Sequence, residues 1–369
     1  MRSFTILKCT LPLLLLSLLI SANTITAQST KERKGDRSFV VLPALGSTPE
    51  TGFMFGGVGM VQFKMGNPDL DTRTSSVMAS GVYTVKNQLS IGLLPSLFFE
   101  GEDWMLMGEF SYNYFPELFW GVGTGADNKM RMVSRQVSTR ASLLKQFAPK
   151  LFAGVQLDWN RNYDMRYESM HNEPLDAPNL TGSNDYHSLG AGFILTRDTR
   201  NRLSYPTTGR MLEFSAIFYP EELSTLNSYT IITADLRSYL KLSQDDRSVI
   251  AFRTLSKTSL GTPPIDNLML LGGQNLLRGY YQGRHRDRHG LALQLEWRQT
   301  WSERIGTVLF TDAGQVWNRF ESISLANTRI TAGCGLRFNV NKEERTNIRL
   351  DYGLGKGTSG MYITIGEAF

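Results

Sequence analysis

The residues of this chain that could do chemistry are four histidines, some glycine clusters and an arginine-rich segment. His285 and His289 stand four residues apart, so a shared metal ion is the first possibility to consider. They lie among Arg284, Arg286 and Arg288, however, and these positive charges oppose the binding of a cation. We therefore expect no metal site.

Enzymatic chemistry has little support in the sequence. The chain contains no Gly-x-Ser-x-Gly nucleophile turn. Gly56, Gly57 and Gly59 lack the spacing of a dinucleotide-binding loop and open no helix, so they indicate a strand that bends or pairs weakly. A lipid hydrolase would need a serine, a histidine and a polar orienting group together on one wall, which spacing alone does not settle. We expect no enzyme and no cofactor.

The elements that would position these residues are β-strands. Sixteen are predicted, the even number typical of bacterial outer-membrane barrels, at 50–64, 75–88, 89–100, 104–115, 117–126, 131–147, 151–167, 184–197, 209–220, 227–242, 247–260, 289–301, 304–316, 327–340, 346–355 and 360–369. The predicted fold is an all-β, transmembrane, antiparallel β-barrel of sixteen strands over residues 50–369. Because an open sheet edge in lipid leaves backbone groups unpaired, the first strand must pair with the last or with a partner's edge.

Alternation of side chains supports this prediction. Residues 327–340 alternate between an apolar face, which includes Ile330 and Phe338, and a polar face, which includes Arg337. A soluble sheet would also hide one face, but around a closed barrel the apolar face meets lipid and the polar face lines a watery lumen. The segment that holds Phe310 alternates poorly.

The first residues of the chain indicate export. Arg2 and Lys8 precede an apolar run over 11–20, and small and polar residues follow as far as Ala27, as in a secretory signal peptide. The apolar run is well short of the ~20 residues of a membrane-spanning helix, so a retained anchor is the lesser alternative. We expect cleavage after Ala27, which leaves 28–49 as a short periplasmic segment before the barrel.

Composition excludes other classes of protein. A net charge of +5, two units of which lie in the expected leader, gives no argument for nucleic acid. Cys334 is the one cysteine after the leader, so no internal disulfide forms. The 34 glycines and 11% aromatic residues suit a barrel with aromatic girdles, although a soluble β-sandwich would share part of this composition.

The connections predict which ends of the strands face the periplasm. Short links are expected there, and the predicted ones include 148–150, 243–246 and 302–303. The long links, 168–183 and 261–288, then fall on the outside of the cell.

An ordered set of motifs runs through the second half of the chain. The motifs are DTR at 198–200, PTTG at 206–209, LLGGQNLLRGYY at 270–281, EWR at 296–298, FTDAG at 310–314 and IGEAF at 365–369. Together they resemble the barrel of the BamA/TamA family, in the bacterial surface antigen superfamily of outer-membrane assembly and translocation proteins. The resemblance covers about residues 190–369 by motif and 50–369 by strand count.

The resemblance implies that the loop motif Arg278, Gly279 and Tyr280 folds back into the lumen. Arg278 would then dock on two carboxylates of the inner wall, Asp312 and Glu296. A guanidinium can fork two hydrogen bonds to a carboxylate, and a glycine allows a tight turn beside it. The alternative is that Arg278 is one more solvated loop arginine.

The resemblance also implies a role for the end of the chain. An aromatic residue such as Phe369 on an alternating last strand, with Ile363 and Ile365 on the same face, resembles the sorting signal that barrel-assembly machinery reads. Phe369 could also simply anchor at the membrane interface.

The function implied by the resemblance is outer-membrane protein assembly or protein translocation, in the outer membrane of a Gram-negative bacterium and in contact with lipid and lipopolysaccharide. Family members carry soluble POTRA domains before the barrel, and 28–49 is too short for one. We therefore expect a periplasmic or outer-membrane partner to capture the client. The alternatives are a gated or plugged passive channel and, less favoured, a barrel-embedded lipid hydrolase.

Overall fold

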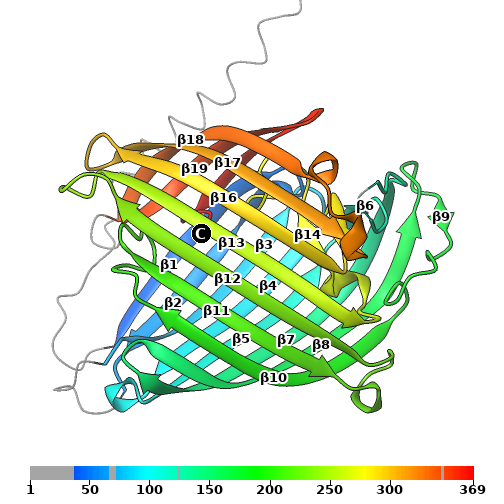
Figure 1. Ribbon diagram of the computed structural model, residues 1–369, viewed down its shortest axis with the longest axis horizontal. Coiled ribbons are helices and arrows are strands. Elements are labelled where there is room, and N and C mark those ends of the chain that lie inside the picture. Colours follow the sequence, from blue (N-terminus) through cyan, green and yellow to red (C-terminus); the bar gives the residue numbers. More distant parts are fainter. Residues whose placement is uncertain (1–36, 66–71, 124, 342–344) are drawn as a thin grey trace, which may run out of the picture.

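The chain forms a ring of antiparallel strands that closes on itself (Figure 1). The computed structural model describes residues 37–65, 72–123, 125–341 and 345–369. The expected leader, residues 1–27, lies outside the described residues.

Sixteen strands build the wall. They are β1 (Ser38–Thr48), β2 (Gly52–Phe63), β3 (Ser75–Thr84), β4 (Leu89–Phe98), β5 (Trp104–Tyr114), β7 (Met130–Ala148), β8 (Leu151–Glu168), β10 (Tyr186–Asp198), β11 (Gly209–Tyr219), β12 (Tyr229–Lys241), β13 (Ser248–Gly261), β16 (His289–Thr300), β17 (Ile305–Trp317), β18 (Arg329–Asn341), β19 (Thr346–Gly355) and β20 (Thr358–Ile365). Each pairs with the next along the chain, and β1 meets β20. The predicted fold class, a sixteen-stranded antiparallel β-barrel, is confirmed.

Shorter elements decorate the ends of the wall. They are β6 (Glu117–Phe119), β9 (Pro174–Leu175), β14 (Met269–Leu271) and β15 (His285–Asp287), with the single turns η1 (Glu100–Glu102), η2 (Glu221–Leu223), η3 (Ile265–Asn267), η4 (Phe320–Ser322) and η5 (Leu325–Asn327). Across the described ranges, no helix has the length and apolar character to span a membrane.

Two of the predicted segments were wrong, and the two errors cancel in the strand count. Residues 38–48, placed by the prediction in the periplasmic segment 28–49, form the first strand of the barrel. Residues 117–126, predicted as a spanning strand, contribute only the three-residue β6. Gly121 and Gly123 have φ of +95° and +113°, which an extended strand does not adopt.

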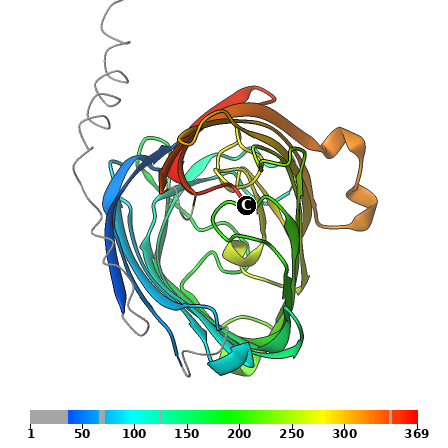
Figure 2. The ribbon, with the colours of Figure 1, turned by 90° about the vertical axis from the view of Figure 1, so that its left-hand side faces the viewer.

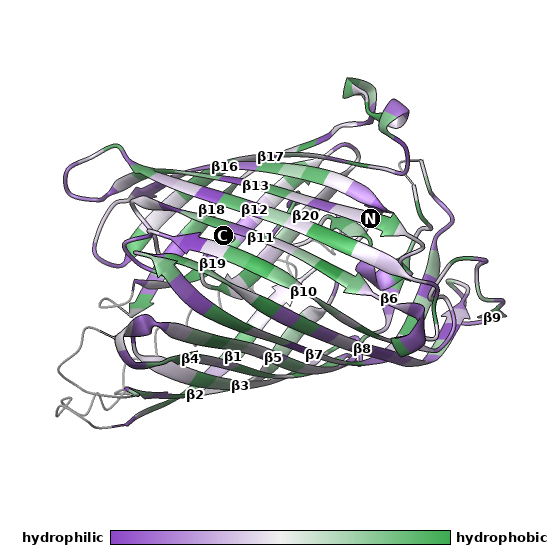
Figure 3. Ribbon diagram, turned by 60° about the horizontal axis from the view of Figure 1, so that its bottom comes forward, coloured by the Kyte–Doolittle hydropathy of each residue, from purple (hydrophilic) through white to green (hydrophobic). Residues whose placement is uncertain are grey.

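The wall has an apolar outer surface and a polar inner one. On β18 the side chains of Ile330 and Phe338 are exposed on the outside, while Thr331 and Arg337 are buried inside. Figure 3 shows hydrophobic and hydrophilic residues alternating along the strands. An outward apolar band is what the hydrocarbon of a bilayer requires of a barrel.

The connections differ in length at the two ends of the barrel. The turns 149–150 and 301–304 are short, whereas the connections 169–185 and 262–288 are long. The long connections carry β9 and β14. These two short strands lie with β6 at one end of the barrel (Figure 1). We treat that end as extracellular, because outer-membrane barrels have short periplasmic turns.

The longest connection, 262–288, occupies the lumen rather than the space above it. Figure 2, which looks along the barrel, shows the yellow chain of this segment within the ring of strands. Its Leu271 and Leu277 are fully buried and pack against Ala292 and Val316 of the wall. The extracellular half of the lumen therefore has a small apolar core of its own.

Candidate functional site

Arg278 lies inside the barrel and contacts three carboxylates of the wall. Its Nη1 is 2.6 Å from Glu296 Oε1 and 3.0 Å from Asp351 Oδ2, and its Nη2 is 3.4 Å from Asp312 Oδ1. All four side chains are fully buried. Burial alone would lower the pKa of Arg278, but the three carboxylates raise it, so the guanidinium stays charged.

Glycines allow the loop to approach the wall closely at this point. Gly279 has a φ of +116°, and a Cβ there would stand 3.0 Å from the backbone of Gly353 and Leu354. The Gly279 amide donates a hydrogen bond to Tyr362 Oη at 3.0 Å. A larger residue at 279 would be strained at this φ and would crowd the backbone of β19.

The Arg278 contacts belong to a longer ion network. Four arginines and four carboxylates alternate in it, and all come from the loop, the wall or the end of the chain. The pairs are Arg278 with Glu296, Asp312 and Asp351, Arg298 with Glu296, Arg337 with Asp351 and Glu367, and Arg349 with Asp351. The balanced charges allow so many ionised groups to be buried together.

The family resemblance pointed to Asp312 and Glu296 and missed Asp351. Asp351 touches Arg278, Arg337 and Arg349, so it is the most connected carboxylate of the network. One signal was available, because Asp351 alternates onto the polar face of its strand.

Phe310 completes the pocket around the guanidinium. Its ring centroid lies 3.5 Å from Arg278 Cζ, a cation–π contact. Phe310 and Val308 face inward on β17, as Asp312 does. The poor alternation of this segment therefore has a physical cause, since its inner face packs against the loop instead of water.

Tyr280 holds the loop on its other side. Its Oη accepts a hydrogen bond from the Lys356 amide at 3.1 Å, and its carbonyl accepts one from Tyr362 Oη at 3.2 Å. His285 meets the Tyr280 ring edge-on at 5.2 Å between ring centroids. The three residues of the loop motif thus lie together against β19 and β20.

His285 and His289, the pair considered for a metal site, have different surroundings. His285 is buried against Tyr280, and burial, followed by Arg284 and Arg329, lowers its pKa to about 4. His289 instead stacks with Trp317 and Phe320. The two histidines thus make contacts with different aromatic residues.

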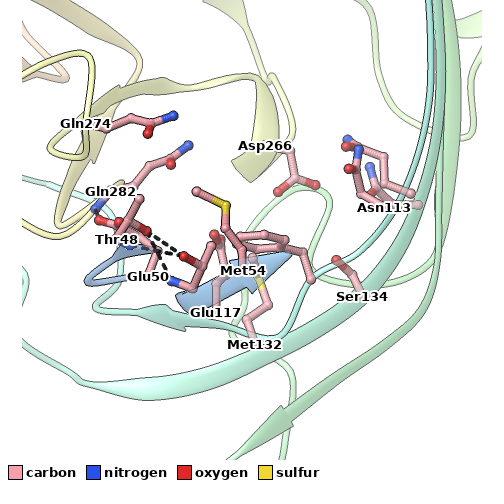
Figure 4. Close-up of a pocket in the computed structure, with 14 residues that line it drawn as sticks. Thr48, Glu50, Met54, Asn113, Glu117, Met132, Ser134, Asp266, Gln274 and Gln282 are labelled. Carbon is pink, nitrogen blue, oxygen red and sulfur yellow. Dashed lines mark hydrogen bonds between the residues drawn. The ribbon is translucent and has the colours of Figure 1, made fainter. Parts of the chain in front are cut away.

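A cavity of about 360 Å³ lies between the loop and the wall near the extracellular end (Figure 4). Glu50 of the β1–β2 turn, Glu117 of β6 and Asp266 of η3 line it. Burial raises the pKa of Glu117, and the charges of Asp266 and Glu50 add to that effect while Arg286 opposes it. Glu50 Oε1 also accepts a 2.7 Å hydrogen bond from the Gln282 amide, which ties the β1–β2 turn to the loop.

The last residues of the chain leave the wall. Gly366, with a φ of +87°, turns the chain into the lumen after β20. The expectation that Phe369 shares the outer face of Ile363 and Ile365 is wrong, because Phe369 is buried inside against Tyr239. Figure 2 places this end of the chain within the ring of strands.

The ring closes through very little pairing at its seam. β1 pairs with β2 along its whole length but with β20 only at Ser47 and Ile363. Val41 and Leu42 are 62% and 46% exposed, and adjacent residues of a strand point to opposite sides. The first half of β1 is therefore uncovered on both faces.

Comparison with solved structures finds the same architecture. BamA from Haemophilus ducreyi lacking POTRA domains 1-3 aligns over 91% of this chain and 71% of its own, with a TM-score of 0.59 and 15% identity. CdiB from Acinetobacter baumannii and CdiB from Escherichia coli align over 91% of this chain, with TM-scores of 0.58 and 0.60 and 12% identity. The chain covers 60% and 64% of these CdiB chains, which is less than two thirds of their length.

Sequence comparison identifies the family. No curated protein sequence matches the chain significantly. The model of the Omp85 superfamily domain matches residues 95–369, well over half of the chain. This protein is therefore a member of the Omp85 superfamily, a sixteen-stranded β-barrel of the Gram-negative outer membrane.

Proposed function

We propose that this barrel assists the assembly of outer-membrane proteins, and that its β1–β20 seam receives the client. The observation that carries the proposal is the single paired position, Ser47 with Ile363, at which the ring closes. Among the described residues, no other position of β1 is paired with β20. Such an edge is a template onto which another strand can pair.

The membrane increases the free-energy cost of leaving this strand edge unpaired. An unpaired backbone group in hydrocarbon costs several kcal/mol, so a strand that completes the edge is strongly favoured. The inward turn at Gly366 keeps residues 366–369 off the seam. A client strand can therefore reach the exposed half of β1, next to Val41 and Leu42.

Translocation of a polypeptide through the lumen is the second candidate function. The likeness to two CdiB barrels favours it at the level of fold. It requires the loop 262–288 to leave the lumen, which the Arg278 network resists. In either function we propose that a periplasmic or outer-membrane partner captures the client, and that outer-membrane lipid surrounds the wall.

A reversible lock tests the assembly proposal. Ser47→Cys with Ile363→Cys, in a chain whose Cys334 is replaced by serine, places a disulfide across the seam. Val58→Cys with Ser80→Cys is the matched control, because these residues face each other on β2 and β3. Cells depleted of the unmodified protein would carry one variant or the other.

The expected result is that the seam lock lowers the level of folded outer-membrane clients and that a reductant restores it. The control lock leaves client levels unchanged. If the oxidised seam lock supports normal levels of folded clients, assembly at the seam is refuted. Translocation through the lumen does not need the seam to open, so secretion of a client into the medium should continue in the seam-locked chain if translocation is the function.

A further inference from the structure

The connection between β17 and β18, residues 318–328, lies beside the barrel rather than over its mouth. Figure 2 shows this orange segment projecting outward from the ring of strands. It contains η4 and η5 and joins the wall at the end that carries the long connections. The connection therefore lies on the outer side of the wall, the side that faces lipid.

Residues on the outer face of the wall show that the connection folds against that face. On β16 and β17 the odd-numbered side chains, such as Leu293 and Leu309, are exposed on the outside. The same alternation directs His289, Gln315 and Trp317 outward. Yet these three are buried, with 8%, 7% and 9% exposure. Something on the outside of the barrel must cover them.

The cover is the connection itself. The ring of Phe320 lies 5.6 Å from that of His289 and 6.4 Å from that of Trp317, between centroids. Gln315 Nε2 donates a 3.3 Å hydrogen bond to the carbonyl of Ser322. The outward amide of Gln315 is thus satisfied by the connection, which fixes the connection to the outer wall.

The far side of the connection is apolar and uncovered. Phe320 is 67% exposed, Ile323 47% and Leu325 94%. Three large apolar side chains within six residues are unfavourable in water. Arg319 and Glu321, both exposed, flank Phe320 with opposite charges.

The outer surface of β18 continues this apolar side. Ile330, the first outward residue after the connection, is 63% exposed and begins the lipid-facing row of that strand. The stacked aromatic rings at His289, Trp317 and Phe320 lie where a barrel carries an aromatic girdle. The apolar outer row of β18 therefore begins five residues after Leu325, next to the connection.

We propose that residues 318–328 form a membrane anchor, in which Phe320, Ile323 and Leu325 enter the acyl layer of the outer leaflet. Arg319 then faces the anionic headgroup region. The anchor would fix the height and tilt of the barrel on the side of β16 to β18. This inference does not depend on the proposed function of the seam.

Depth-dependent fluorescence tests the anchor. Leu325→Cys, in a chain whose Cys9 and Cys334 are replaced by serine, carries an environment-sensitive dye. Glu173→Cys is the matched control, since Glu173 is exposed in the connection that carries β9, at the same end of the barrel. Both proteins are reconstituted in phosphatidylethanolamine–phosphatidylglycerol vesicles with and without lipopolysaccharide. Some of the lipids carry a spin-label quencher just below the headgroup.

The dye at Leu325 is expected to be blue-shifted and quenched several-fold more strongly than the dye at Glu173. An effect in both kinds of vesicle supports insertion into any acyl layer, and an effect only with lipopolysaccharide supports that lipid as the partner. Equal quenching at the two sites in both kinds of vesicle overturns the proposal. A label-free check is Leu325→Asp, which should speed proteinase K cleavage of the connection in vesicles several-fold, and an unchanged cleavage rate also overturns it.

Discussion

Replacing Arg278 by alanine should release the loop from the lumen while the wall stays folded. The variant leaves Glu296, Asp312 and Asp351 fully buried with one cation too few. Removing one partner of a buried ion pair costs about 3–5 kcal/mol. At 1.4 kcal/mol for each power of ten, the ratio of docked to undocked loop should fall by roughly two to three and a half powers of ten.

Arg284→Ala is the matched control for this prediction. Arg284 belongs to the same connection and pairs with Asp127 at 2.8 Å, but Asp127 is 80% exposed. An exposed pair of that kind contributes about 0–1 kcal/mol. Arg278→Lys should fall between the two, because an ammonium keeps the charge but cannot fork to several carboxylates.

The assays are proteinase K cleavage of residues 262–288 in detergent and single-channel conductance in planar bilayers. Arg278→Ala should be cut much faster than the unmodified protein and should show larger openings, while heat-modified mobility on gels reports an intact wall. Equal cleavage of the Arg278→Ala and Arg284→Ala variants would refute the idea that the buried network holds the loop.

Three further changes test the loop and the end of the chain. Glu50→Ala removes the acceptor of the part-buried Gln282 amide, a loss of about 0.5–1.5 kcal/mol, and should speed hydrogen exchange there; Glu50→Gln should exchange nearly as slowly as the unmodified protein. The depressed pKa of His285, about 4, means that the docked loop holds it neutral and that release binds a proton below pH ~6.5. His285 should therefore favour release as the pH falls from 6.5 toward 4, and His285→Phe should remove that part of the pH dependence of loop cleavage, so an unchanged profile argues against it. Phe369→Ala removes a buried ring and should lower the temperature of heat modification more than Ile365→Ala, which changes an exposed residue; equal shifts would mean that the packing of Phe369 contributes little.

Local sequence patterns predict the strands least well at the β1–β20 seam. The strand β1 contains Pro43 and Gly46, and the sequence predicts a periplasmic segment there instead of a strand. It is nevertheless a strand, since β2 pairs with it along its full length. The segment 117–126 shows the opposite error, because its apolar residues pack under the loop, where Trp120 meets Tyr281 at 5.1 Å between ring centroids.

The sequence by itself determined the antiparallel barrel and the inner and outer faces of most strands, although the count of sixteen was reached through two errors that cancel. The faces follow from period-two alternation, which acts over neighbouring positions, whereas the entry of the loop motif into the lumen rests on the family resemblance. The tertiary structure alone decided that Arg278 meets Asp351 as well as Asp312 and Glu296, that Phe369 turns inward, and that the ring closes at one residue pair. Those contacts join residues far apart in the chain, and their geometry depends on the register and closure of the whole barrel.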